Sequence, residues 1–548
     1  MTSVYTIGDY LLDRLAELGI TELFGVPGDY NLHFLDHVVG HPDIRWVGSS
    51  NELNAGYAAD GYARLRGAGA LLTTYGVGEL SAINAIAGSY AESVPVIHIV
   101  GAPRKELQAR GAKVHHSLGD GDFRHFLRMA EEVTCASADL EAPSATWEID
   151  RVLRTVIFDK RPGFLMLAAD VAATPTDPPA SPLERITQSS TEAAEEQFEQ
   201  AVREFLPRRR AAVLADLGVH RLGAAPALHD LIERTKLPVA TLSWGKTLVD
   251  ESAPNFAGIY VGAASEEGVL RTVENADALI TLGVEFTDNT TAGFSINIDS
   301  ARQIEVKRSV SRVGNESFTP LSMERAIRIL TKVLLDLDID PMPQAQPQVP
   351  EIVEASNTTL TQDTLWSLVA QSLAPGNVVL AEQGTSFFGM SEHRFPKDSM
   401  FIGQPMWGSI GYTLPAMLGA GLADRSRRPI LLIGDGSAHL TIQEMGQIIR
   451  EKIPAVIILV NNSGYTVERA IHGPTAVYND IPAWNWRLAP QFFGAEPGTY
   501  QTLRATTGQE MHDALKTAAE APHDLVLIEA VTDADDAPEV LRKITAAL

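Results

Sequence analysis

The chain has 548 residues, of which 45% are hydrophobic and 21% charged, a composition typical of globular proteins. Its 44 Lys and Arg residues against 69 Asp and Glu residues give a net charge of −25, which argues against nucleic acid and anionic membrane surfaces as partners. Single cores stop growing well below this length, so several domains are expected.

Cys135 is the only cysteine, which excludes an intrachain disulfide and fits a reducing compartment. No apolar run of the sequence reaches membrane-spanning length, and the first residues lack a basic region followed by an apolar core. We therefore expect a cytoplasmic protein that spans no membrane.

Two proline-rich stretches, residues 172–182 and 336–350, have few core-forming side chains and are predicted to be linkers. They divide the chain into segments of about 1–180, 184–335 and 355–548. In each segment, short apolar runs alternate with amphipathic stretches, which predicts strands alternating with helices. We expect an α/β protein of three domains, each built on a mainly parallel sheet.

In the first segment, residues 44–47 predict a strand and Asn51 begins a predicted helix, whose small residues would allow close packing against another helix or chain. Glu52 lies at the helix start, where any anion is stabilised, so its position alone does not require a catalytic role. A histidine pair, His115 and His116, follows in a polar stretch that on its own favours an ordinary loop.

The second segment carries the least functional information. Apolar runs at residues 211–215 and 278–282 predict strands. The turn at residues 217–223 lacks the GxGxxG spacing, so no dinucleotide-binding fingerprint is present there.

The third segment contains the most informative pattern. An apolar run at residues 429–433 leads into a Gly-Asp-Gly triplet around Asp435, and a second run at 455–460 leads into Asn462. With a helix predicted around residues 441–451, both loops would meet at one edge of a parallel sheet. Side by side, the carboxylate and the amide present oxygen ligands for Mg²⁺, and the glycines allow close approach of a phosphate. Two ordinary β-to-α turns are the alternative.

This spacing of Gly-Asp-Gly and Asn-Asn resembles the diphosphate-binding motif of thiamine diphosphate enzymes. The resemblance implies that Asp435, Asn462 and the backbone carbonyl of Gly464 hold the Mg²⁺ ion bound to the cofactor's diphosphate. It also implies that Glu52 contacts the aminopyrimidine ring and shifts its tautomer, and that Ile410 forces the cofactor's two rings into a V. The residues expected to contact the cofactor are Glu52, Thr385, Gly408, Ser409, Ile410, Asp435, Gly436, Ser437, Asn462, Gly464 and Tyr465.

The chain is similar over essentially its whole length to the pyruvate, indolepyruvate and branched-chain 2-oxo acid decarboxylases of this family. The similarity is carried by residues 4–14, 24–30, 76–82, 115–116 and 464–468. It implies non-oxidative decarboxylation of a 2-oxo acid to an aldehyde and CO₂. Because protonation of a carbon atom must precede release of the aldehyde, proton donors near neutral pH are expected. The implied catalytic residues are Asp29, Glu52, His115, His116 and Glu468.

The segment after a predicted strand at residues 378–381 bears on substrate size. Pyruvate-specific relatives usually carry Thr at the position of Gln383, and the surrounding sequence resembles decarboxylases of branched-chain and aryl 2-oxo acids. The predicted substrate pocket consists of Gln383, Phe387, Phe388 and Val467, with ordinary core packing an equal alternative for the two phenylalanines. We expect a substrate bulkier than pyruvate.

Other functions stay open: decarboxylation of pyruvate, indolepyruvate or phenylpyruvate, a carboligase of the acetohydroxyacid-synthase type, and a catalytically inactive homologue. The histidine pair and the missing FAD signal speak against the carboligase. The intact Glu52, Asp435, Asn462 and Glu468 speak against an inactive homologue. The resemblance further implies a homodimer or homotetramer in which the first segment of one chain and the third segment of its partner share a site for a small 2-oxo acid.

Overall fold

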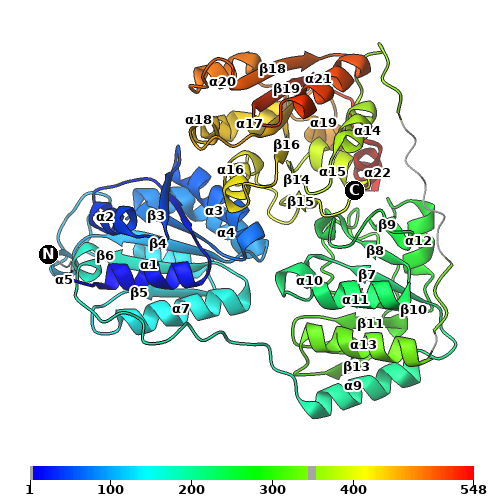
Figure 1. Ribbon diagram of the computed structural model, residues 1–548, viewed down its shortest axis with the longest axis horizontal. Coiled ribbons are helices and arrows are strands. Elements are labelled where there is room, and N and C mark those ends of the chain that lie inside the picture. The colour runs from blue at the N-terminus through cyan, green and yellow to red at the C-terminus, as the bar shows by residue number, and fades with distance from the viewer. Residues whose placement is uncertain (1–3, 338, 344–352, 548) are drawn as a thin grey trace.

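The computed structural model describes residues 4–337, 339–343 and 353–547. It contains three sheets, and each forms a separate lobe with its own helices (Figure 1). We call these lobes the first, central and third domains. The architecture confirms the predicted fold class, an α/β protein with three mainly parallel sheets.

The first domain is built on six parallel strands in the order β2-β1-β3-β4-β6-β5. The strands are β1 (Glu22–Gly25), β2 (Arg45–Gly48), β3 (Gly69–Thr74), β4 (Val96–Ala102), β5 (Ala136–Asp139) and β6 (Gly163–Ala168). The helices are α1 (Ile7–Glu17), α2 (Leu32–Gly40), α3 (Glu52–Arg66), α4 (Val77–Ala91), α5 (Lys105–Ala109), α6 (His125–Glu131), α7 (Ala145–Asp159) and α8 (Ala169–Ala172). The central strands β3, β4 and β6 are buried along their whole length, as expected of strands covered on both faces.

The central domain has seven strands in the order β13-β12-β11-β10-β7-β8-β9. Strands β9, β8, β7, β10 and β11 are parallel to one another. Strands β11, β12 and β13 form an antiparallel edge. The strands are β7 (Ala211–Ala215), β8 (Val239–Thr241), β9 (Phe256–Ile259), β10 (Ala278–Leu282), β11 (Gln303–Val306), β12 (Ser311–Val313) and β13 (Glu316–Phe318). The helices are α9 (Glu192–Phe205), α10 (Leu217–Arg221), α11 (Ala225–Thr235), α12 (Glu267–Glu274) and α13 (Met323–Leu337).

The third domain again has six parallel strands, in the order β15-β14-β16-β17-β19-β18. The strands are β14 (Val378–Ala381), β15 (Met400–Ile402), β16 (Pro429–Gly434), β17 (Val456–Asn461), β18 (Tyr500–Ala505) and β19 (Leu525–Val531). The helices are α14 (Gln362–Ser372), α15 (Thr385–Ser391), α16 (Thr413–Ala423), α17 (Asp435–Thr441), α18 (Met445–Arg450), α19 (Thr466–His472), α20 (Ala489–Phe492), α21 (Gly508–Glu520) and α22 (Glu539–Ala547). Counted within each domain, this strand order is the same as in the first.

Helix α3 of the first domain packs directly against α16 of the third (Figure 1). Small residues bring the two backbones close: a Cβ atom on Gly419 would lie 1.8 Å from the carbonyl oxygen of Ala58. The hydroxyl of Tyr412 donates to Asp60 across the same contact at 2.6 Å. Buried side chains of both domains form one continuous cluster around the crossing, so the two domains share a core.

The segment between β16 and β17 differs from the helix predicted at residues 441–451. Helix α17 begins at once at Asp435, and a 3₁₀ turn over Ile442–Glu444 separates it from α18. The turn places the buried carboxylate of Glu444 where it accepts hydrogen bonds from the backbone of Ser50 (3.0 Å) and the amide of Asn54 (2.9 Å) in the first domain. This contact between domains could not be read from the periodicity of the segment.

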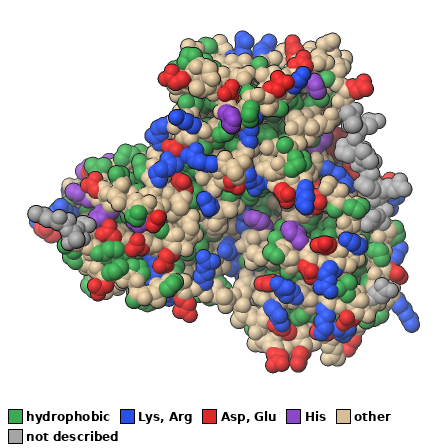
Figure 2. Space-filling model, viewed as in Figure 1, with side chains coloured by type: hydrophobic (Ala, Val, Ile, Leu, Met, Phe, Trp, Pro, Cys, Tyr) green, Lys and Arg blue, Asp and Glu red, His purple; other side chains and the backbone are tan. Residues whose placement is uncertain are grey.

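Residues 173–190 contain no helix or strand, in keeping with the first predicted linker. In the second predicted linker, residues 338 and 344–350 lie outside the described residues. The domain boundaries themselves stay a prediction. Within the described ranges, no helix has the length and apolar character needed to cross a membrane. On the face shown in Figure 2, acidic and basic side chains are interspersed over all three lobes rather than gathered by sign.

Candidate active site

Three oxygen atoms meet at the carboxyl ends of β16 and β17. The strands pair in parallel with Gly434 opposite Val460, so the loops that follow them lie next to each other. The side-chain oxygen of Asn462 lies 3.1 Å from Oδ1 of Asp435 and 2.9 Å from the carbonyl oxygen of Gly464. The structure thus brings together the three groups that the sequence predicted as metal ligands.

The spacing of these oxygens fits Mg²⁺. Octahedral Mg²⁺ binds oxygen at about 2.0–2.1 Å, which separates neighbouring ligands by roughly 2.9–3.0 Å. The Asp435 side chain is only 2% exposed, and this burial raises its pKa to about 6, against the opposing effect of hydrogen bonds from the backbone of Gly436 and of residues 462–464. The Asn462 oxygen faces the two other oxygens with no hydrogen between them, an arrangement that a bound cation would stabilise.

Backbone shape at the same edge depends on glycine. Gly464 has φ +137°, and a Cβ atom there would lie 1.9 Å from the carbonyl oxygen of Asn479. A Cβ atom on Gly436 would lie 2.5 Å from the ring of Tyr465. These close approaches leave no room for a side chain at either glycine, and they place Tyr465 against Gly436 at the start of α17.

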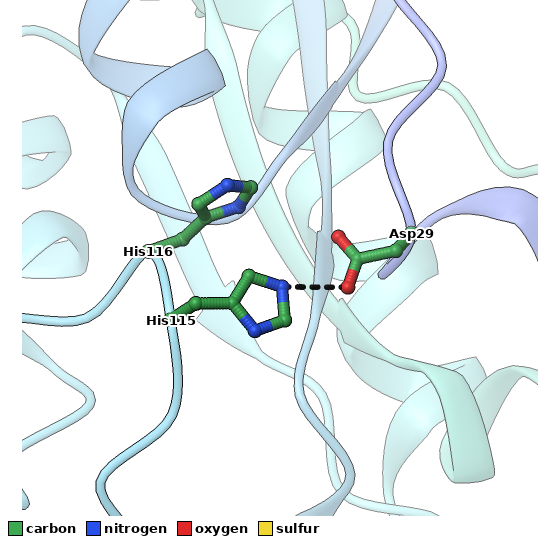
Figure 3. A group of neighbouring side chains, drawn as sticks. All are labelled: Asp29, His115 and His116. Carbon is green, nitrogen blue, oxygen red and sulfur yellow. Dashed lines mark hydrogen bonds and ion pairs between the residues drawn. The ribbon is translucent and has the colours of Figure 1, made fainter.

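A second cluster lies at the carboxyl edge of the first sheet. Nε2 of His115 lies 2.7 Å from Oδ2 of Asp29, and the rings of His115 and His116 are 4.6 Å apart at a steep angle (Figure 3). Tyr30 stacks on His115 with ring centroids 4.8 Å apart. His116 adopts a left-handed φ of +64°, and its buried Nδ1 has no hydrogen-bond partner among the described residues. Three of the predicted catalytic residues are therefore neighbours.

Glu52 is the first residue of α3 and is half-buried. Asn51 caps this helix by accepting a hydrogen bond from the backbone of Asn54 at 2.8 Å, which fixes where the glutamate emerges. A Cβ atom on Gly78 would lie 3.1 Å from Oε1 of Glu52, so the carboxylate lies against the start of α4, just after the turn that follows β3. The predicted catalytic glutamate is thereby placed at the same sheet edge as Asp29.

The loop that contains Gly408, Ser409 and Ile410 is held by two helices of the first domain. Tyr57 of α3 shares a 2.6 Å hydrogen bond with the Ser409 hydroxyl, and the Asn84 amide donates to the same hydroxyl at 3.3 Å. The left-handed φ of +63° at Gly408 turns the chain toward the half-buried Ile410. Sequence reasoning missed Tyr57 and Asn84, because only the fold brings these helices to the loop.

The predicted substrate residues divide into two groups. Gln383 lies beside Gly408, since a Cβ atom on that glycine would lie 3.9 Å from its Cγ, and Val467 lies 3.9 Å from the corresponding position on Gly384. Thr385 is buried where α15 begins.

Phe387 and Phe388 are instead 2% and 6% exposed and lie in the core of the third domain. Phe387 also lines a cavity of about 210 Å³ where the three domains meet. Their position matches the alternative of core packing, and a role in the substrate pocket stays a prediction.

Glu468, the remaining predicted catalytic residue, belongs to the third domain. It is exposed on α19 of the third domain. Among the described residues, no hydrogen bond or ion pair connects it to Asp29, His115 or His116. Whether Glu468 acts with these three residues stays a prediction.

The domains also match known families in sequence. Residues 5–125 match the thiamine pyrophosphate enzyme N-terminal TPP binding domain, residues 198–331 the central domain of these enzymes, and residues 383–530 their C-terminal TPP binding domain.

Curated relatives match over the full length. The alpha-keto-acid decarboxylase of Mycobacterium leprae (strain TN) is 53% identical over 545 residues, which cover 99% of this chain and 95% of that protein. The protein of the same description from Mycobacterium tuberculosis (strain ATCC 25618 / H37Rv) is 53% identical over 551 residues, covering 100% and 97%. That of Mycobacterium ulcerans (strain Agy99) is 52% identical over 549 residues, covering 100% and 96%. The chain belongs to the thiamine pyrophosphate enzymes, which confirms the resemblance inferred from its motifs.

Proposed function

We propose that this protein is a thiamine diphosphate-dependent decarboxylase that converts 2-oxo acids to aldehydes and CO₂. The observation that carries the proposal is the Asp29–His115–His116 cluster at the edge of the first sheet, in a chain whose third sheet gathers three oxygens suited to a cation. The description of its relatives as alpha-keto-acid decarboxylases supports the same reaction. A cytoplasmic location stays a prediction.

Asp435, Asn462 and the Gly464 carbonyl would hold Mg²⁺, and the Mg²⁺ would hold the cofactor's diphosphate. When bound, thiamine diphosphate supplies the electron sink that cleavage of the carbon–carbon bond requires. Glu52 would provide a carboxylate for the aminopyrimidine nitrogen at the other end of the cofactor. The Gly408 carbonyl and Ile410 lie on the loop that would fix the shape of the cofactor between these two ends.

The clustered side chains of the first domain would move protons. The Asp29 carboxylate would orient the His115 imidazole through their 2.7 Å contact. A protonated imidazole beside an ordered second histidine can deliver a proton to the substrate's carbonyl carbon after CO₂ leaves. Glu468 would complete this set from the third domain of a partner chain.

A homodimer is the assembly that would complete the site. Large apolar side chains are exposed beside each motif: Val77 at the start of α4 near Glu52, Trp407 before Gly408, and Leu440 on α17 after Asp435. Apolar surface of this kind around a polar site is typical of a protein interface. A second copy of the chain would cover it and would bring Glu468 of one chain toward Asp29 of the other. Whether two dimers assemble further into a tetramer is a separate prediction.

We further propose a substrate larger than pyruvate. The Gln383 Oε1 atom is buried without a hydrogen-bond partner in the described residues and lies beside Gly408, and Val467 adds an apolar wall next to Gly384. Each methylene buried against such a wall contributes roughly 0.8 kcal/mol. Branched-chain aliphatic 2-oxo acids fit this combination, and aryl 2-oxo acids are the larger alternative.

The test is a panel of 2-oxo acids assayed for headspace CO₂ and aldehyde in the presence of thiamine diphosphate and Mg²⁺. We expect 2-oxoisovalerate or 2-oxoisocaproate to exceed pyruvate at least about tenfold in kcat/KM, which a single methylene contact can account for. No aldehyde from any acid would refute the decarboxylase, and a condensed hydroxy acid in its place would indicate a carboligase. Preference for pyruvate over every larger acid would refute only the pocket.

A further inference from the structure

The single proton of the Thr466 hydroxyl is already used in a hydrogen bond. Its Oγ1 atom lies 2.7 Å from the carbonyl oxygen of Ala534, and a carbonyl cannot donate, so Thr466 is the donor in this contact. The Asn462 amide lies on the other side of the same hydroxyl, 2.8 Å away. Since Thr466 has only lone pairs left to offer there, the amide must present its NH₂ group to Thr466.

This arrangement decides what faces the cation site. With the NH₂ group toward Thr466, the Asn462 oxygen points to Asp435 and Gly464. In the reverse orientation, N–H groups would donate to Gly464 O at 2.9 Å and to Asp435 Oδ1 at 3.1 Å, and these bonds would fill the position of the metal. Without a cation, the oxygens of Gly464 and Asp435 would favour the reverse orientation, because both accept hydrogen bonds. It also needs Thr466 to donate to Asn462, which would break the bond to Ala534.

A neighbouring arginine strengthens the same arrangement. The Arg469 side chain is 5% exposed, and its Nη2 donates to the carbonyl of Ser463 at 3.0 Å and to the carboxylate of Asp480 at 2.8 Å. Its Nη1 lies 3.3 Å from the Asn462 carbonyl and 3.4 Å from that of Ala534. The arginine therefore holds the backbone on both sides of the amide and keeps the Ala534 carbonyl within reach of Thr466.

We propose that Thr466 is a positioning residue that orients the Asn462 amide through Ala534 and so keeps an oxygen, rather than an N–H group, in the metal site. The inference rests on the Mg²⁺ site proposed above and extends it to a residue that need not touch the ion. Groups behind metal ligands fix the orientation of the ligands, and changing them typically costs about 10–100-fold in metal affinity.

The first test compares Thr466→Val, which removes the hydroxyl at nearly constant volume, with Thr466→Ser, which keeps it. Calorimetry measures thiamine diphosphate binding to the apo-protein over a series of Mg²⁺ concentrations. For Thr466→Val we expect the Mg²⁺ concentration at half-maximal binding to rise about 10–100-fold, and for Thr466→Ser to stay within about threefold of wild type. Saturating Mg²⁺ should restore full cofactor binding to the valine variant.

Two results would overturn the role of Thr466: a valine variant with a wild-type Mg²⁺ requirement, or a serine variant that loses as much as valine. Measurements on the wild-type protein distinguish a failure of the positioning role from a failure of the proposed metal site. Cofactor binding that is independent of Mg²⁺ in wild type contradicts the metal site, whereas Mg²⁺-dependent binding that Thr466→Val leaves unchanged contradicts only the positioning role. If the valine chain does not fold, Thr466→Ala takes its place with the same expected contrast to serine.

A double-mutant cycle with Asn462→Asp isolates the orientation of the amide. A carboxylate presents oxygen in either orientation, so in the Asn462→Asp background Thr466→Val should change the Mg²⁺ requirement by less than about twofold. Equal losses in both backgrounds would show that Thr466 acts through general packing and would contradict the proposal. Unfolding midpoints without Mg²⁺ report whether each variant is folded.

Discussion

The first and third domains have the same strand order but carry different chemistry at the same edge of the sheet. The third strand of each sheet is followed by the turn before Gly78 in the first domain and by Asp435 in the third. The fourth strand leads toward His115 and His116 in one and to Asn462 in the other. Topology therefore determines where a functional group can be placed, and residue type determines what it does there.

Burial also separates the two edges. Asp435 and Asn462 are 2% and 4% exposed, whereas the side chains of Asp29 and His115 are 49% and 59% exposed in the single chain. A metal site needs ligands held in place before the ion arrives, and burial supplies that order. Proton donors need access to the reacting carbon and to groups from the partner. We infer that the third domain holds the metal-bound diphosphate end of the cofactor and that the first domain supplies Glu52 and proton donors at its other end.

The largest effect should come from Glu52→Gln. The glutamine keeps the size and helix position of Glu52 but removes the carboxylate that the aminopyrimidine nitrogen needs. We expect nearly all turnover to be lost, while thiamine diphosphate still binds with Mg²⁺, measured by steady-state kinetics and by calorimetry. Turnover within about tenfold of wild type, a barrier change of only about 1.4 kcal/mol, would contradict the role of Glu52.

Asp435→Ala should instead impair cofactor binding, because the proposed metal site lies in the third domain. We expect Mg²⁺-dependent cofactor binding to fall by at least about 100-fold, since the anionic ligand of the ion is lost. Chelation and gel filtration of wild type should likewise give apo-protein that only Mg²⁺ together with thiamine diphosphate restores. Asp177→Ala, at an exposed position between the first two domains, is the control and should bind normally. Restoration of wild type by the cofactor alone in metal-free buffer would count against the metal site.

Much of this comparison could be predicted from the sequence. The buried runs before Asp435 and Asn462 are continuous and apolar, and parallel pairing leaves little choice about which loops meet. The helix start at Asn51 was also evident from its residue types.

Other features depend on contacts between segments far apart in the chain. The 3₁₀ turn at Glu444 occurs together with hydrogen bonds between Glu444 and the first domain. The role proposed for the Thr466 hydroxyl depends on its hydrogen bond to the carbonyl of Ala534. The depth of Phe387 likewise depends on how α15 packs against its sheet, which local sequence does not determine.

The contact between the domains can be tested through Gly419. Because a Cβ atom there would lie 1.8 Å from the Ala58 carbonyl, Gly419→Ala must push α3 and α16 apart. We expect a loss of about 1–3 kcal/mol in stability, measured from denaturant midpoints. Gly40→Ala, at an exposed helix end with nothing within 4 Å, is the control and should change stability little. Equal effects of the two substitutions would show that the domains do not depend on this crossing.

An effect on the pH dependence of folding stability is expected from a substitution of Glu79, which is buried behind the turn that faces Glu52. Burial raises the pKa of Glu79 to about 8, against the hydrogen bond from the Gly76 backbone. Since this folded-state pKa is above the ordinary value of 4.5, the stability that the protonated carboxyl contributes is complete below about pH 4.5 and is lost as the pH rises through about 8.

Glu79→Gln should therefore gain stability relative to wild type between pH 5.5 and pH 8.5, by about 3 kcal/mol. Urea midpoints at the two pH values measure the change, with the exposed Glu184→Gln as the control. A difference between variant and wild type that does not vary with pH would show that Glu79 titrates outside this range.

The most direct test of the division of labour mixes two inactive chains, Glu52→Gln and Asp435→Ala, under conditions that allow subunits to exchange. If the first domain of one chain and the third domain of its partner form each site, half of the dimers are hybrids with one intact site. Activity should then recover to about a quarter of the wild-type value. No recovery despite demonstrated exchange would mean that both residues act within one chain, and the shared site would be wrong.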